Sequence, residues 1–103
     1  MGKEGEIGKI TTIKDGRRVV ATAGSRLALI AAFTPAKLVI ITAETDNTGV
    51  IVVGGTTVVA TVLTRQGIPL LAGDSVTLEV DDLIKVYLDS TVTGDGVTYV
   101  YFT

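Results

Sequence analysis

The sequence contains no cysteine and no histidine. Without cysteine the chain can form neither disulfides nor thiolate metal sites, although this leaves its redox compartment undetermined. Without histidine it cannot build a Ser-His-Asp triad, a histidine general base or the common zinc sites. Most hydrolytic chemistry is therefore excluded, and we expect a protein that is not an enzyme and that uses no cofactor or metal.

Charge is also scarce. Charged residues make up 19% of the chain, the formal net charge is −2, and the only adjacent basic pair is Arg17-Arg18. Nucleic acid is not an expected partner, because binding to the phosphate backbone requires a concentrated basic surface. Residues 1–6 are polar where a signal peptide is apolar, and no later run approaches 18 apolar residues, so we expect neither a cleaved signal nor a membrane span.

Apolar residues, in contrast, are abundant. They form 47% of the 103 residues, and the mean hydropathy is +0.51. No Pro- or Ser-rich linker divides the chain, so we expect one domain over residues 1–103, with an N-terminal arm or hairpin at 1–22 and a core at 23–103. Because a chain of this length buries only about two-thirds of its surface, the apolar surplus predicts a homo-oligomer or a docking surface.

The fold class follows from the mixture of Val, Ile and Thr with closely spaced Gly and Asp, which is typical of short strands joined by tight turns. We predict an all-β fold, an antiparallel β-sandwich or jelly-roll-like barrel of about eight short strands. Residues 75–80 alternate cleanly between apolar and polar, which indicates one buried face. Residues 37–43 are almost continuously apolar and are expected to form a central strand with both faces covered.

Turn signals predict the connections. Asp15-Gly16 indicates a hairpin between residues 7–14 and 17–22, and Gly54-Gly55 indicates another between 50–53 and 56–62. Other segments are assigned by composition: a strand in preference to a short helix at 26–33, a turn at 46–49, a loop with an apolar lining at 65–73, and two last strands at 83–89 and 97–102.

The acidic side chains are the remaining candidates for chemistry. They lie mostly at turns, where Asp characteristically binds backbone amides, so we interpret them as structural and not as a carboxylate pair or a calcium site. The residues concerned are Asp74, Glu79, Asp81, Asp82, Asp89 and Asp95.

The tyrosines are clustered near the C-terminus. Tyr99 and Tyr101 share one face of the last strand, and Tyr87 lies in the strand before it. We expect the pair to pack against Tyr87 or to line a subunit interface. An exposed platform for binding sugars is the alternative.

Several turn and strand signatures occur in a distinctive order. The order is Asn-Thr-Gly within residues 46–49, Val-Gly-Gly within 50–55, Pro-Leu-x-x-Gly-Asp-Ser within 67–76, Leu-x-x-Val-Tyr within 82–90 and Gly-Asp-Gly-Val-Thr-Tyr at 94–99. Over residues 37–103 this order resembles that of small virion proteins of tailed bacteriophages. The N-terminal third departs from the pattern.

The resemblance implies a β-sandwich that decorates or cements a phage capsid, often as a trimer, or that belongs to the tail. It implies a homo-oligomer, with a trimer favoured, that is made in the host cytoplasm and binds the major capsid protein or another virion protein at the capsid surface. The alternative is a carbohydrate- or receptor-binding module of a tail or fibre. We take as candidate interface residues Lys9, Arg17, Arg18, Tyr87, Tyr99 and Tyr101.

Overall fold

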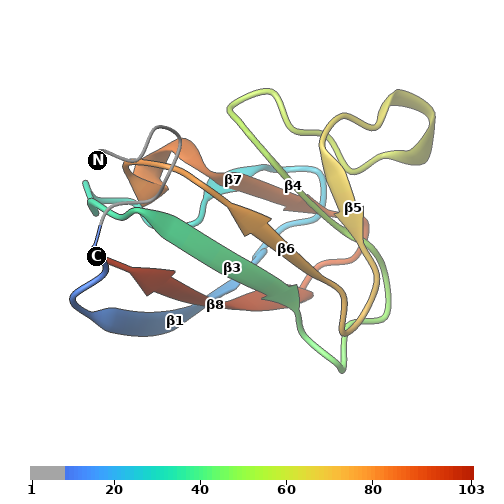
Figure 1. Cartoon of the computed structure of the whole chain (residues 1–103). Helices are drawn as coiled ribbons and strands as arrows, with labels where there is room; N and C mark the ends of the chain where they lie inside the picture. Colours follow the sequence, from blue (N-terminus) through green and yellow to red (C-terminus); the bar gives the residue numbers. More distant parts are fainter. Residues whose placement is uncertain (1–8) are drawn as a thin grey trace.

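A computed structural model describes residues 9–103, which form two antiparallel sheets of four strands packed face to face (Figure 1). The first sheet has the order β1(Ile13–Val19), β8(Gly96–Phe102), β3(Leu38–Ala43), β6(Ser75–Leu78). The second sheet has the order β2(Leu27–Ala28), β7(Tyr87–Ser90), β4(Ile51–Gly54), β5(Ile68–Leu70). Two 3₁₀ turns, η1(Val62–Thr64) and η2(Leu83–Lys85), precede β5 and β7. The predicted all-β sandwich is confirmed, while the first eight residues of the predicted arm lie outside the described residues.

The core lies between the two sheets and is made by alternate residues of each strand. In β3, Val39, Ile41 and Ala43 are fully buried, whereas the residues between them are only partly buried. β3 is an interior strand of its sheet, between β8 and β6, as its composition predicts. The expectation that both of its faces are covered is wrong, because Leu38 and Ile40 on its outer face are only partly buried and no element of residues 9–103 packs fully over them.

The second sheet contributes Ile51, Val53 and Leu88 to the same core, each fully buried. Along one open edge of the sandwich, Arg18 on β1 donates a hydrogen bond from Nε to the carbonyl oxygen of Ala28 on β2, at 3.1 Å. This bond links the two sheets where no strand connects them. Within residues 9–103 no helix has the length and apolar character to span a membrane.

The predicted N-terminal hairpin is wrong. Asp15 and Gly16 lie inside β1, which pairs along its whole length with β8. Gly16 is opposite Tyr99, and a Cβ at Gly16 would lie 2.4 Å from the Tyr99 hydroxyl oxygen. Glycine is therefore required here because the tyrosine ring covers the backbone, and not because the chain turns.

The hairpin predicted at Gly54-Gly55 is also wrong, because β4 pairs with β5 and β7 instead. Residues 55–67 form a long loop over the outer face of the second sheet. There Val58 and Ala60 are buried against Val52, beside the partly buried Tyr87. Both faces of the second sheet are thus covered by this one chain.

Two further segments differ from their predicted form. The expected loop at 65–73 contains β5, an edge strand whose Pro69 is tolerated because it lies at the border of the sheet. Its apolar lining is confirmed only in part, since Leu70 is 3% exposed whereas Ile68 and Leu71 are 41% and 61% exposed. The predicted strand at 26–33 is reduced to the two residues of β2.

Candidate functional site

Buried aspartates hold the loops of the sandwich in place. Asp89 is 2% exposed; its Oδ1 accepts hydrogen bonds from the amides of Gly24 and Ser90 at 3.0 and 2.9 Å, and its Oδ2 accepts one from Ala60 at 2.9 Å. Backbone amides are bound in the same way by the carboxylates of Asp74, Asp82 and Asp95. The prediction that turn aspartates bind backbone amides is confirmed for these four residues. Among residues 9–103, no three acidic side chains converge as in a metal site.

The tyrosines do not form a platform. Tyr99 is 8% exposed and Tyr101 partly buried, both on the inner face of the first sheet, with ring centroids 6.1 Å apart. Tyr87 lies on the outer face of the second sheet beneath the 55–67 loop, so the predicted packing of the pair against Tyr87 is wrong. Burial raises the pKa of Tyr99, with a further increase from Tyr101.

The three basic candidates lie in different places. Arg17 projects from the outer face of the first sheet, whereas Arg18 points inward toward β2. Lys9 precedes β1, and its carbonyl oxygen accepts a hydrogen bond from Lys37. These residues therefore do not form one basic surface.

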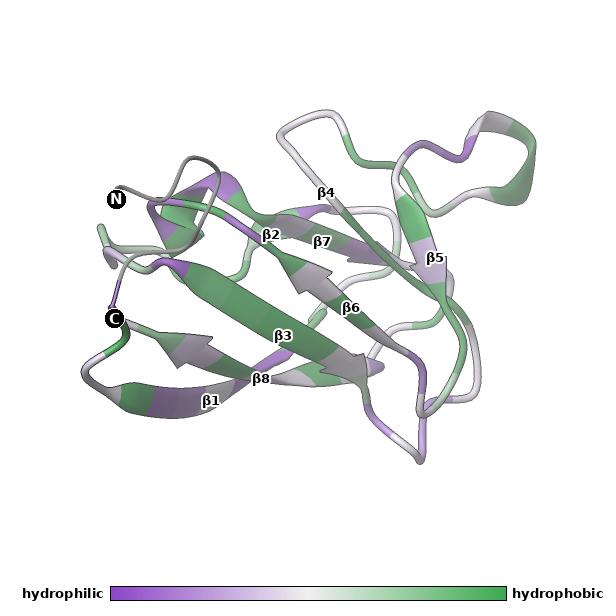
Figure 2. Ribbon diagram, viewed as in Figure 1, coloured by the Kyte–Doolittle hydropathy of each residue, from purple (hydrophilic) through white to green (hydrophobic). Residues whose placement is uncertain are grey.

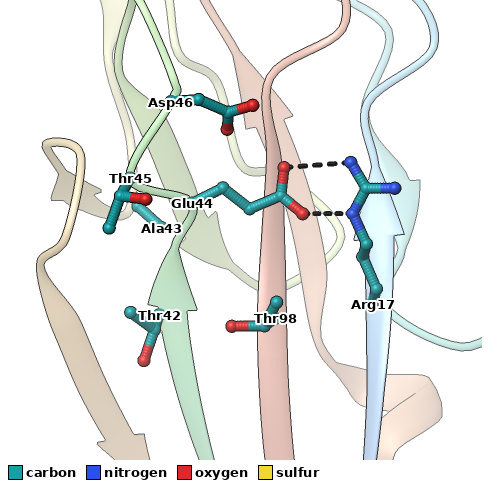
Figure 3. Close-up of a pocket in the computed structure, with 7 residues that line it drawn as sticks. All are labelled: Arg17, Thr42, Ala43, Glu44, Thr45, Asp46 and Thr98. Atoms are coloured by element: carbon teal, nitrogen blue, oxygen red, sulfur yellow. Dashed lines mark hydrogen bonds and ion pairs between the residues drawn. The ribbon is translucent and has the colours of Figure 1, made fainter.

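Arg17 instead belongs to a cleft of ≈ 430 Å³, lined mainly by polar residues, at one end of the outer face (Figure 3). The guanidinium binds Glu44 in a bidentate manner, through Nε to Oε2 and through Nη2 to Oε1 at 3.1 Å. The hydrogen bond to Glu44 raises the pKa of Arg17. The remaining lining residues are Thr42, Ala43, Thr45, Asp46 and Thr98. The positive charge of Arg17 is thus matched locally by a carboxylate.

The other end of the same face is apolar. The strand register places side chains in rows across the sheet, and two neighbouring rows bring five apolar side chains together. We call this group the outer apolar patch; it consists of Ile13, Leu38, Ile40, Val100 and Phe102. Ile13 is 67% exposed and the other four are partly buried. Figure 2 shows the apolar character of β3 along most of its length.

The 55–67 loop projects from the sandwich (Figure 1) and carries a second group of exposed apolar side chains. Val62 and Leu63 in η1 are 70% and 95% exposed, and we call them the apolar tip. The loop below them is held by paired backbone hydrogen bonds between Val59 and Gln66, at 3.0 and 2.9 Å. The bond from Ala60 to the buried carboxylate described above adds a third anchor. The tip is therefore presented by a well-braced loop.

Sequence reasoning missed both apolar surfaces. The signal for the outer patch was present in residues 37–43, where both alternating sets of strand residues are mostly apolar. Only one of these two sets faces the core in β3. The signal for the tip was obscured because Val62 ends an apolar run that was predicted as a strand. No protein family, curated protein or solved structure matches this chain.

Proposed function

We propose that this chain is a structural virion protein of a tailed phage that decorates the capsid and stabilises the shell by bridging capsid subunits. The observation that carries the proposal is the presence of two separate apolar surfaces on one small domain. The outer apolar patch belongs to the first sheet, and the apolar tip belongs to the loop that covers the second. A bridging protein needs at least two contact surfaces, and exposed apolar groups mark such contacts.

The apolar tip is the part that we propose to dock on the major capsid protein or another virion protein. Leu63 is almost fully exposed on a loop whose base is fixed by backbone pairs and by Asp89. A preorganised loop loses little conformational entropy on binding, so more of the contact energy appears as affinity. Repeated over many copies, such contacts would strengthen a shell without any chemical reaction.

The described polar groups support a role other than catalysis. The carboxylates of Asp89 and Asp95 are buried and bound to backbone amides, and Arg17 is paired with Glu44. A general acid or base has to reach substrate with a free proton-transferring group. We therefore propose a protein that is not an enzyme, uses no cofactor, and has protein partners at the capsid surface instead of nucleic acid or membrane.

The alternative function, a carbohydrate- or receptor-binding module, rests on exposed aromatic side chains. Tyr99 is 8% exposed and stacks with Tyr101 inside the sandwich, so neither ring is presented as a flat platform. This arrangement favours the decoration role over the alternative.

Cosedimentation tests the proposal. Capsids assembled from the major capsid protein of the phage that encodes this chain are mixed with the purified chain and pelleted, and the bound fraction is measured. We expect saturable binding that Leu63→Glu weakens at least about tenfold, as for loss of a central interface residue. Thr57→Glu, an exposed position in the same loop, is the matched control and should bind as the wild type does.

Two results would overturn the proposal: absence of binding to the shell, or binding that Leu63→Glu leaves unchanged. Retention on a glycan array by the wild-type chain, together with absence of capsid binding, would favour the carbohydrate-binding alternative. Shells saturated with the chain should also resist heating better than bare shells, measured by light scattering.

A further inference from the structure

The outer face of the first sheet has the layout of a protein interface. Its central strands, β8 and β3, carry Val100, Phe102, Leu38 and Ile40 of the outer apolar patch. Its edge strands are more polar: β6 presents the hydroxyl side chains of Ser75 and Thr77, and β1 presents Asp15 and Arg17 in the two middle rows after Ile13. Interfaces characteristically combine an apolar centre with a polar rim.

We propose that this face binds a second copy of the chain, with the two-fold axis parallel to the strands and midway between β8 and β3. In this arrangement β8 of one copy lies over β3 of the other, and each row of side chains meets the same row of its partner. The contact is isologous, so the same patch serves both copies. Packing of two sheets with their strands aligned is a common solution in β-proteins.

The size of the face is consistent with a stable pair. Strands of about six residues at about 3.3 Å per residue, with four strands about 4.8 Å apart, cover a plane of about 20 by 19 Å. That is a flat area of about 400 Å² in each copy, before the additional surface of the protruding side chains is counted. With the surface of the protruding side chains included, two such faces together bury the roughly 1,000 Å² that a specific interface requires.

The apolar rows favour this symmetry over the other two-fold arrangement. With the axis along the strands, β1 lies over β6, so Asp15 faces Thr77 of the second copy and Arg17 faces Ser75 of the second copy. Val100 then faces Ile40 of the second copy, and the apolar centre is continuous. Charged groups thus meet hydroxyls at the rim, where they can keep water or hydrogen bonds.

With the axis in the sheet plane but across the strands, β1 would lie over β1. If that axis passes through the row of Asp15, Asp15 faces its own copy, which places two like charges in contact, and the row of Ile13 faces the row of Arg17. Apolar side chains would then cover polar ones without pairing them, which costs free energy. If the axis lies between the rows of Ile13 and Asp15, the apolar rows meet but the row of Arg17 is left outside the contact. Only the axis along the strands keeps the whole face in contact and also sets each apolar row against an apolar row of the second copy.

Mass measurement tests the pairing directly. Light scattering behind a sizing column, with the chain loaded at about 0.1 mM, should give twice the 10.7 kDa mass of one chain. Ile40→Glu and Ile13→Glu should each give the single-chain mass with an unchanged circular dichroism spectrum. Ile13 is 67% exposed in the single chain, so its substitution tests the interface with little risk to the fold. The control, Leu63→Glu in the apolar tip, should remain a dimer.

Cross-linking tests the symmetry. Because the chain has no cysteine, Thr98→Cys supplies a unique thiol close to the proposed axis, and a short bis-maleimide should link it to its own copy. Ser75→Cys on β6 lies over β1 of the second copy, and the same reagent should leave it unlinked. Linking at position 75 together with failure at position 98 would overturn the arrangement.

The pairing itself is overturned by a single-chain mass for the wild type at 0.1 mM, by a trimer mass, or by a dimer that survives both outer-face substitutions. A trimer is what the resemblance to phage virion proteins favours, so the measured mass separates the two. This inference does not depend on the proposed function: a chain that binds capsids as a monomer would refute the pairing and leave the decoration role intact.

Discussion

Removal of the Asp89 carboxylate should loosen three segments at once. The side chain is 2% exposed and accepts three backbone hydrogen bonds, from Gly24, Ala60 and Ser90, at 2.9 to 3.0 Å. Asn has nearly the same shape but offers one acceptor and one donor group. In Asp89→Asn, the side-chain NH₂ group therefore points at a backbone N–H, and because both groups are donors no hydrogen bond forms between them. The remaining hydrogen bonds are weaker because their acceptor is no longer charged.

The expected cost can be estimated from these contacts. A hydrogen bond to a charged group contributes about 1.5–3 kcal/mol, and a buried amide left unpaired costs about 1–3 kcal/mol. Asp89→Asn should thus lower the free energy of unfolding by about 3 kcal/mol, and Asp89→Ala, which leaves all three amides unpaired, by about 3–5 kcal/mol. At about 4–8 °C per kcal/mol for a domain of this size, the Asn variant should melt more than about 10 °C lower.

Urea unfolding followed by far-ultraviolet circular dichroism measures this difference, and amide hydrogen exchange at Gly24 and Ala60 locates it. The matched control is Asp46→Asn, which makes the same chemical change at an exposed carboxylate and should alter stability by less than about 0.5 kcal/mol. If Asp89→Asn were as stable as this control, the reasoning that the buried carboxylate anchors the loops would be refuted.

Three further predictions concern packing and titration. Gly67→Ala should destabilise by about 2 kcal/mol or more, because φ is +122° and a Cβ would lie 2.8 Å from the Val53 carbonyl oxygen; Gly55→Ala, with no atom within 4 Å of its Cβ, is the control in urea unfolding. Ile41→Ala, at a fully buried site, should cost about 2–5 kcal/mol in the same assay. Because the pKa of Tyr99 is raised in the folded state, the contribution of Tyr99 to stability should be constant below the ordinary tyrosine pKa of about 10 and should be lost as pH rises from there through the raised value; Tyr99→Phe should reduce that loss in pH-dependent melting.

The sequence predicted the fold class because the relevant signals are local. Alternation at residues 75–80 gives β6 its one covered face, and the apolar run at 37–43 gives β3 its interior position. The pairing of strands is not local, and there the prediction failed. Asp15-Gly16 has turn chemistry, but β1 gains a full ladder with β8 at the far end of the chain, and the close approach of Tyr99 explains the glycine.

The candidate site was harder to predict because it depends on which strands are neighbours. Tyr99 and Tyr101 were correctly placed on one face, yet their packing against Tyr87 requires the two strands to share a layer, and β7 and β8 belong to different sheets. The role of the turn aspartates was predictable, since an Asp at a turn binds nearby amides. The identity of those amides was not, because Ala60 lies 29 residues from Asp89.

The apolar surplus of the sequence now has a location. In β3 the inward-facing residues, including Val39 and Ile41, contribute to the core between the sheets. If the outer face of this sheet were simply exposed to solvent, the outward-facing residues of β3 would be polar, as Ser75 and Thr77 are in β6. β3 instead carries Leu38 and Ile40 there, with Val100 and Phe102 beside them on β8. The second sheet has no such exposed face, because the 55–67 loop covers it. Part of the excess hydrophobicity thus lies on the outer face of the first sheet, over which no element of residues 9–103 packs fully, and part lies elsewhere, as at Val62 and Leu63 of the apolar tip. A second copy would bury the part on the sheet face.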